Sequence, residues 1–207
     1  MRHSAADRII GLYSEKAAGW IEDRAPVLGQ GGGTGLDEAG WLATFMACLP
    51  SGARVLDVGC GSGWPVAAAL LEHGFCVTGV DPVSGLLDHA AQTLPAGEWI
   101  AGDMRTMELG RTFDGVLAWF SLFHLTPEDQ RIALPRILAH VGPGGVIMFP
   151  TGSAEGVQIG EWRGEPLYHG SLGPQEYRAM LNGNGFVEIG DATDQRAPGL
   201  VWLARRV

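Results

Sequence analysis

The stretch Arg54-Val-Leu-Asp-Val-Gly-Cys-Gly-Ser-Gly63 decides how this chain folds. Its first half, Arg54–Val58, is a short apolar run typical of a β-strand, and its second half is a run of alternating glycines. A helical pattern begins at Trp64, so the glycines form a turn between a strand and a helix. Glycine allows positive φ angles and close approach of the backbone to a ligand, and helix N-termini attract anionic groups. The stretch therefore predicts a ligand-binding loop.

The spacing of the glycines indicates which ligand the loop binds. A loop for a nicotinamide dinucleotide reads GxGxxG and binds a pyrophosphate, whereas this loop reads GxGxG and follows Asp57. A carboxylate at that position opposes a pyrophosphate but suits an ammonium group. S-adenosylmethionine (SAM) carries an ammonium and a carboxylate at its amino-acid end. The loop therefore favours SAM over NAD, with a turn that merely needs glycine as the structural alternative.

Strand-like and helical patterns alternate on the C-terminal side of this loop. We expect strands over residues 54–58, 75–80, 98–101, 113–120 and 144–149, and helices over 64–73, 84–94 and 126–140. Continuously apolar strands alternating with helices are typical of a parallel sheet covered on both faces. The sequence thus predicts an α/β fold with a doubly wound sheet.

The two ends of the chain differ from this core. Before it we expect two helices, over 5–24 and 37–49, joined by a glycine-rich loop at 25–36. After it comes a segment without clear periodicity at 151–173, then a helix at 174–184 and a hairpin of strands at 186–192 and 199–205. At 207 residues we expect a single domain. Its parts are a helical cap (1–49), a SAM-binding core (50–150) and a substrate-side loop, helix and terminal hairpin (151–207).

Two further acidic positions follow predicted strands. Asp81 ends the second strand, where a carboxylate accepts hydrogen bonds from ribose hydroxyls, or alternatively caps the turn before Pro82. Asp103 and Met104 follow the third strand. There, Asp103 would accept from the adenine amine and Met104 would cover the ring, the alternative being a loop acid and a core methionine. The carboxyl ends of strands in such a sheet line the ligand crevice.

Together these residues resemble the ordered motifs of class I SAM-dependent methyltransferases, of the small-molecule type. The motifs are the stretch Asp57–Gly63, Asp81, Gly102–Met104, the strand Phe113–Phe120 and Val141-Gly-Pro-Gly-Gly145. The resemblance implies a seven-stranded sheet of order 3-2-1-4-5-7-6 with strand 7 antiparallel. It implies a cofactor site formed by Asp57, Gly59, Cys60, Gly61, Gly63, Asp81, Pro82, Asp103, Met104 and Trp119. Cys60 is interpreted as a small packing residue and not as a nucleophile.

The resemblance also implies where the methyl acceptor binds. Residues after the fourth strand, here Trp119, Phe120 and Ser121, lie beside the transferable methyl in this family, and the N-terminal cap would direct Tyr13 and Trp20 inward. Tyr168 and His169, in the segment without periodicity, are candidates for the wall of the acceptor site, although a surface loop is equally consistent. We therefore predict substrate contacts at Tyr13, Trp20, Phe120, Ser121, Tyr168 and His169.

His124 is the candidate catalytic residue. It follows the fourth strand and could act as a general base for a hydroxyl acceptor, the alternative being a histidine that satisfies loop backbone groups. Ala118 and Trp119 stand where metal-dependent catechol-type enzymes place an acid, so we expect no catalytic metal. The absence of an Asn/Asp-Pro-Pro-Tyr/Phe motif argues against methylation of nucleobase amines.

Composition narrows the partners. The formal net charge is −9 and the 14 basic residues form no run, which disfavours nucleic acid as a substrate. The three cysteines show no metal-binding or disulfide spacing, the first residues lack an apolar signal core, and no apolar stretch reaches the roughly 18 residues of a membrane span. We expect a cytoplasmic monomer or homodimer without membrane contact.

The predicted function is in-line, metal-independent transfer of a methyl group from SAM to a small molecule, leaving S-adenosylhomocysteine (SAH). The motifs do not separate this enzyme from a non-catalytic SAM-binding regulatory or partner protein. An NAD-dependent oxidoreductase is opposed by Asp57 and by the glycine spacing. The acceptor and the methylated atom cannot be inferred from the motifs.

Overall fold

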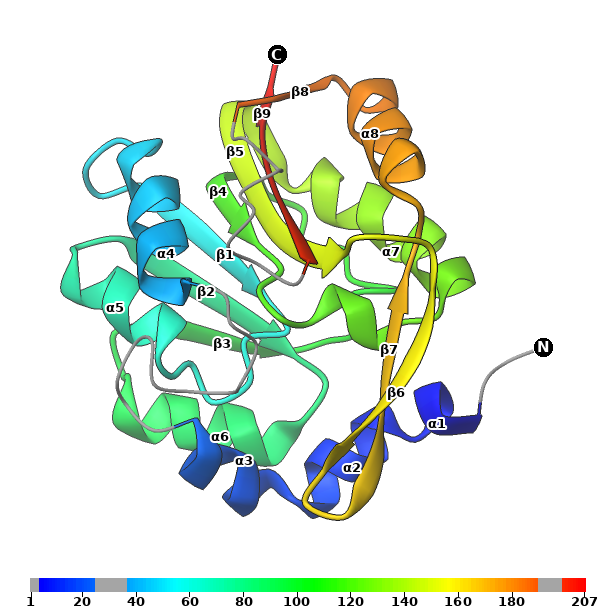
Figure 1. Cartoon of the computed structure of the whole chain (residues 1–207). Helices are drawn as coiled ribbons and strands as arrows, with labels where there is room; N and C mark the ends of the chain where they lie inside the picture. The colour runs from blue at the N-terminus through cyan, green and yellow to red at the C-terminus, as the bar shows by residue number, and fades with distance from the viewer. Residues whose placement is uncertain (1–3, 25–36, 190–198) are drawn as a thin grey trace.

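A seven-stranded sheet of order β3-β2-β1-β4-β5-β9-β8 forms the centre of the computed structural model, which describes residues 4–24, 37–189 and 199–207 (Figure 1). The strands are β1 (Arg54–Val58), β2 (Cys76–Asp81), β3 (Glu98–Ala101), β4 (Phe113–Leu117), β5 (Val141–Gly152), β8 (Phe186–Glu188) and β9 (Gly199–Arg206). Strands β1 to β5 pair in parallel, whereas β9 is antiparallel to both β5 and β8. Numbered within this sheet alone, the order is the expected 3-2-1-4-5-7-6, so the predicted topology is confirmed.

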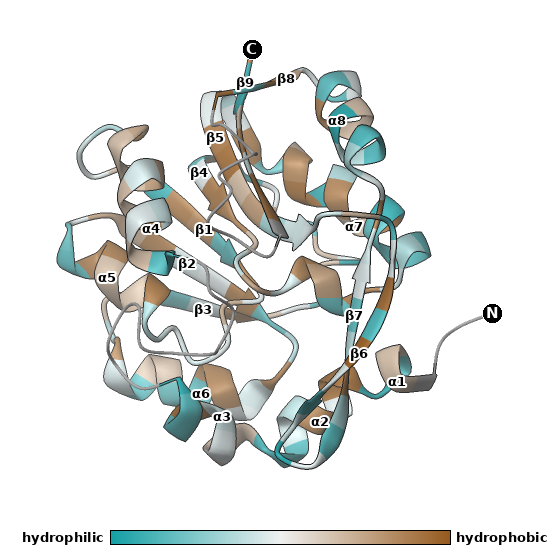
Figure 2. Cartoon of the chain, in the orientation of Figure 1, coloured by the Kyte–Doolittle hydropathy of each residue, from teal (hydrophilic) through white to brown (hydrophobic). Residues whose placement is uncertain are grey.

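Helices cover both faces of the sheet (Figure 1). They are α4 (Glu38–Ala47) and α5 (Val66–Glu72) on one face, α7 (Pro127–Ala139) and α8 (Pro174–Gly183) on the other, and α6 (Ser84–Thr93) beside β3. Successive strand residues alternate between the two cores: Val55 packs with α4 and α5, and Leu56 packs with α7. The hydrophobic colouring of β1, β4 and β5 in Figure 2 reflects this burial on both sides. No helix among the described residues is long and apolar enough to cross a membrane.

The N-terminal cap differs from the single helix expected over 5–24, and that prediction is wrong. The chain forms three short helices, α1 (Ser4–Asp7), α2 (Ile9–Glu15) and α3 (Ala17–Asp23), with a non-helical break at Lys16. The break lets Ile9 and Tyr13 pack against α6 and the C-terminal half of the chain. The glycine-rich loop expected at 25–36 lies outside the described residues.

The segment 151–173, expected to be irregular, forms a β-hairpin, and that prediction is also wrong. Strands β6 (Gly156–Trp162) and β7 (Glu165–Ser171) make a separate two-stranded sheet that packs on α1 and α2 (Figure 1). The turn has positive φ at both Arg163 (51°) and Gly164 (80°), the geometry favoured in two-residue hairpins. Because β6 is almost wholly exposed, it lacks the alternation of apolar and polar residues that is typical of a strand with one buried face.

Several element ends differ from the sequence-based expectation. The fourth strand ends at Leu117 and not at residue 120, and Phe120 adopts a positive φ of 52° before a 3₁₀ turn, η1 (Leu122–His124). The fifth strand is longer than expected, and β8 ends at Glu188. These ends place residues 118–126 across the carboxyl edge of the sheet.

Candidate active site

The glycine loop after β1 has the geometry that the spacing predicted. Gly59, Gly61 and Gly63 have φ values of 74°, 55° and 76°, which side chains rarely adopt. A Cβ on Gly59 would collide with the Ser121 side chain, and one on Gly61 would lie 3.0 Å from Trp20 Nε1. The loop therefore needs glycine both for its backbone turn and for the closeness of neighbouring side chains.

Asp81 anchors this loop to the end of β2. Its carboxylate accepts hydrogen bonds from the backbone N–H groups of Gly61 and Val83, each at 2.9 Å. Burial raises the pKa of Asp81, while these two bonds act in the opposite direction. One bond to each oxygen leaves acceptor capacity on both, directed at the cavity that Asp81 lines.

Asp57 is a buried carboxylate beneath the loop. Its side chain is 3% exposed and accepts no hydrogen bond from a described residue. Burial, and next the charge of Asp81, raise the pKa of Asp57 to about 7. A cationic group placed beside it would restore its ionised form. Ser62 Oγ, in the same loop, is also buried without a hydrogen-bond partner among the described residues.

A cavity of about 350 Å³ opens between the loop, the N-terminal helices and η1. Backbone of the glycine loop and the carboxylate of Asp81 form one side. Apolar and aromatic residues also line it, among them Ile9, Tyr13, Leu86 and Phe120. A concave site with apolar walls and a few polar groups is typical of small-molecule binding.

Tyr13 and His124 form a hydrogen-bonded pair in the wall of this cavity. The Tyr13 hydroxyl lies 3.0 Å from His124 Nε2, and His124 Nδ1 lies 3.0 Å from the carbonyl oxygen of Tyr168. Because a carbonyl only accepts, Nδ1 carries the proton, and Nε2 accepts from the Tyr13 hydroxyl. Burial lowers the pKa of His124 to about 4, and burial followed by the charge of Asp81 raises the pKa of Tyr13. Both groups are therefore neutral near pH 7.

Aromatic rings surround this pair. The ring of Tyr13 lies 5.1 Å from that of Trp20 and 5.3 Å from that of Trp162, and the His124 ring lies 5.3 Å from that of His169. Such distances are typical of favourable aromatic packing. The hairpin β6–β7 thus supports the cavity wall from behind.

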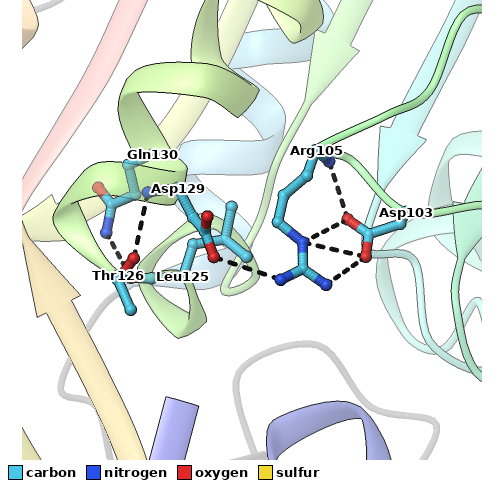
Figure 3. A network of polar contacts seen from close by, with 6 residues as sticks. All are labelled: Asp103, Arg105, Leu125, Thr126, Asp129 and Gln130. Carbon is cyan, nitrogen blue, oxygen red and sulfur yellow. Dashed lines mark hydrogen bonds and ion pairs between the residues drawn. The ribbon is translucent and has the colours of Figure 1, made fainter. Parts of the chain in front are cut away.

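Arg105 bridges two acidic residues at the other flank of the cavity (Figure 3). Its side chain donates to both oxygens of Asp103, and its NH1 atom lies 3.2 Å from Asp129 Oδ2. Burial raises the pKa of Asp103, but the bonds from Arg105 outweigh it and lower that pKa below its usual range. The bridge ties the loop after β3 to the first turn of α7. Within the described ranges, no group of three or more His, Cys, Asp or Glu side chains could hold a metal ion.

Comparison with known proteins identifies the core of the chain. Residues 55–145 match the family model described as a methyltransferase domain, and these residues extend from β1 into β5, glycine loop included. This part of the chain is similar to methyltransferase domains.

Curated relatives match this chain over part of their length. A dTDP-3-amino-3,4,6-trideoxy-α-D-glucopyranose N,N-dimethyltransferase of Streptomyces venezuelae is 33% identical over 114 residues, covering 52% of this chain and 48% of that protein. An uncharacterized methyltransferase of Mycobacterium bovis is 38% identical over 125 residues, covering 58% and 61%. The chain thus spans about half the length of the curated relatives it matches.

A solved structure shares the fold of this chain. It is the 1,6-didemethyltoxoflavin-N1-methyltransferase of Burkholderia thailandensis, with bound 1,6-didemethyltoxoflavin and SAH. The TM-score is 0.67 at 21% sequence identity, over 98% of this chain and 87% of that one.

The cavity brings together most of the predicted site residues. Those that line it are Tyr13, Trp20, Gly59, Gly61, Asp81, Pro82, Asp103, Met104, Phe120, Ser121 and His124. Those that do not are Asp57, Cys60, Gly63, Trp119, Tyr168 and His169. Tyr168, for example, contributes its backbone carbonyl to His124 while its side chain is 1% exposed.

Two residues near the site were missed by the sequence reasoning. Arg105 is only two positions beyond Asp103, and its spacing could have suggested an ion pair. Glu38 gave no local signal, because its burial depends on Arg24 and Trp119, which are distant in sequence. The main partner of Arg105 is thus local in sequence, whereas the fold brings the partners of Glu38 together.

Proposed function

We propose that this chain transfers the methyl group of SAM to a small-molecule acceptor and leaves SAH. The observation that carries the proposal is the buried carboxylate of Asp57, which accepts no hydrogen bond from a described residue, beneath a positive-φ glycine loop. That combination suits an amino-acid end with a positive charge and a backbone-bound carboxylate. The domain family and the names of the relatives, which act on small molecules, support it.

The residues present fit SAM at three places. Asp57 would accept from the ammonium group, Asp81 from the ribose hydroxyls, and Met104 would cover the adenine. Asp103 fits less simply, because four hydrogen bonds from Arg105 already fill its two oxygens. Its contact with the adenine amine therefore requires Arg105 to shift.

The chain's own contribution to the reaction is alignment, exclusion of water and handling of a proton. Bound SAM supplies an electrophilic methyl for in-line attack. The Tyr13 oxygen can accept a hydrogen bond from the nucleophilic N–H or O–H of the acceptor, while the Tyr13 proton moves toward His124 Nε2. His124 Nδ1–H, held by the Tyr168 carbonyl, fixes the ring for this relay. Ala118 and Trp119, which follow β4, supply no metal ligand, so the proposed step uses no metal.

A labelled-methyl assay tests this function. Incubation with methyl-labelled SAM and a panel of amines and hydroxyl compounds should label at least one acceptor. Tyr13→Phe and His124→Ala should each lower kcat by about 10²-fold, the lower end of general acid–base effects. Ile159→Ala, on the exposed face of β6, is the matched control. Tight SAH binding without any labelled acceptor would favour the non-catalytic alternative, and binding of NAD in place of SAH would overturn the cofactor assignment.

The same proposal includes the cellular location, the type of acceptor and the oligomeric state of the enzyme. Cys48, Cys60 and Cys76 are all free thiols, which suits the reducing cytoplasm. The net charge of −9 suits a small-molecule acceptor and not nucleic acid. We propose a monomer or homodimer, and sedimentation of the purified chain would distinguish the two.

A further inference from the structure

Glu38 is an acidic side chain whose burial the proposed reaction does not use. It lies in the first turn of α4 and is 3% exposed. Its Oε1 atom accepts hydrogen bonds from Arg24 NH2 at 2.8 Å and from Trp119 Nε1 at 2.9 Å. Its Oε2 atom is buried and has no hydrogen-bond partner among the described residues. A buried carboxylate oxygen without a donor is costly unless a ligand supplies one.

The fold places this oxygen near the carboxyl ends of β1 and β4. Trp119, which donates to Glu38, stands two residues beyond the end of β4, and β4 pairs with β1 so that Leu117 is opposite Asp57. The charges of Glu38 and Arg24 both act on Asp57. The carboxylates of Glu38 and Asp57 therefore belong to one buried polar cluster.

Among the described residues, this cluster holds more carboxylates than cations. The charges that act on Asp57 are those of Asp81, Glu38 and one guanidinium, that of Arg24. Glu38 Oε2 has no donor among these residues, and Asp57 accepts no hydrogen bond from them. A primary ammonium carries one positive charge and three donors, enough to serve both carboxylates. Arg24 NH2 already binds Glu38 Oε1, so the atom left for the ligand is Glu38 Oε2.

We propose that Glu38 is a cofactor-binding residue whose Oε2 atom accepts a hydrogen bond from the α-ammonium group of SAM, alongside Asp57. The inference rests on the proposed function and adds to it a residue from the N-terminal part of the chain. Binding of the amino-acid end thereby ties α4 to the glycine loop. The contact selects ligands that carry the ammonium group over adenosine thioethers that lack it.

Calorimetry with two ligands tests this assignment. SAH carries the amino-acid arm, whereas 5′-methylthioadenosine has the same adenosine and thioether without it. Glu38→Gln should weaken SAH binding by about tenfold or more, the usual effect of losing a hydrogen bond to a charged group, and change methylthioadenosine binding by less than about twofold. The amide oxygen of the substituted side chain still accepts from Arg24 and Trp119, so the fold is retained. Glu72→Gln, on the exposed end of α5, is the control.

A deaminated analogue of SAH, with a keto group in place of the ammonium, sharpens the test. The native chain should bind this analogue far more weakly than SAH. In Glu38→Gln, the ratio of the dissociation constants of the analogue and of SAH should be smaller. Equal weakening of SAH and methylthioadenosine would show a purely structural role and overturn the proposal, as would unchanged SAH affinity. Failure of the native chain to bind SAH would instead overturn the proposed function itself.

Discussion

The ionisation of Asp57 couples cofactor binding to pH. Its pKa is raised to about 7, so in the free protein the carboxyl group is increasingly protonated below that pH. A protonated carboxyl cannot hold an ammonium ion, and we expect SAH affinity to fall by up to about tenfold for each pH unit below 7. Calorimetry between pH 5.5 and 8 measures this slope. His124, with a pKa of about 4, stays neutral across that range.

Asp57→Asn is the control for this slope. The variant should bind SAH weakly at every pH, with a much flatter profile; a profile as steep as that of the native chain would assign the titration to another group.

The raised pKa of Asp57 also makes folding stability depend on pH. The folded state retains a proton that the unfolded state loses above pH 3.8, so this group's contribution to stability decreases as pH rises toward 7.

Asp81 combines a ligand role with a structural one. Asp81→Ala should lower SAH affinity by at least about tenfold, because it removes the ribose acceptor and leaves the N–H groups of Gly61 and Val83 without partners. Asp81→Asn keeps one oxygen and should lose less. Calorimetry beside a thermal melt separates binding from folding, and unchanged SAH affinity in Asp81→Ala would refute the ribose assignment.

At the scale of elements, the hairpin β6–β7 holds the N-terminal helices in place. The Trp162 ring contacts those of Tyr13 and Trp20, and its Nε1 atom donates to Asp23 at 2.8 Å. Arg163 adds hydrogen bonds to the end of α3. These contacts account for the order of three helices that are each too short to be stable alone.

Trp162→Ala should loosen α2 and α3 without unfolding the sheet. Each lost aromatic pair is worth about 0.5–1.5 kcal/mol, enough to raise local opening several-fold. Hydrogen exchange of residues 9–23 should accelerate, while that of β1 and β4 stays unchanged. Ile159→Ala, on the same strand but exposed, should have no effect. Faster exchange throughout the sheet would contradict a role confined to the cap.

The parallel core could be predicted because its signals are local. Each of its strands contains an apolar run, all but β4 end at or just before a glycine or an aspartate, and the turn after Val58 is encoded by closely spaced glycines. The hairpin at 156–171 could not be predicted from local signals. Its strands are held by contacts with α1 and α2 and have no regular buried face of their own. The break at Lys16 has the same cause, because the helical pattern continues through it.

The location of a candidate residue could be predicted where it stands at or just after a strand end, as for Asp57, Asp81 and Met104, whose roles toward SAM stay predictions. It was not predictable where a role depends on a partner far along the chain. His124 was singled out, but the Tyr13 hydroxyl and the Tyr168 carbonyl that fix its proton lie 111 and 44 residues away. Glu38, whose partner Trp119 lies 81 residues away, belongs to the same class.

Considered as a whole molecule, the sheet depends on its antiparallel strand. Strand β9 enters between β5 and β8 and carries Trp202, which is fully buried and donates from Nε1 to Thr151 at 2.9 Å. Trp202→Ala should lower the free energy of unfolding by about 3–5 kcal/mol through the cavity it leaves. Urea unfolding measures this loss, with Val187→Ala, on the exposed side of β8, as the control. A loss below about 1 kcal/mol would mean that the last strand is dispensable.

The proton that sets the polarity of the Tyr13–His124 pair is held by a peptide carbonyl and not by a side chain. Any residue at position 168 presents the same oxygen, as long as β7 follows the same path. A substitution at position 168 therefore does not remove the acceptor that orients the His124 imidazole. A library randomised at position 168 should retain the tautomer of His124, while the packing behind the ring changes. The path of the backbone, and not the identity of residue 168, keeps the proton on His124 Nδ1.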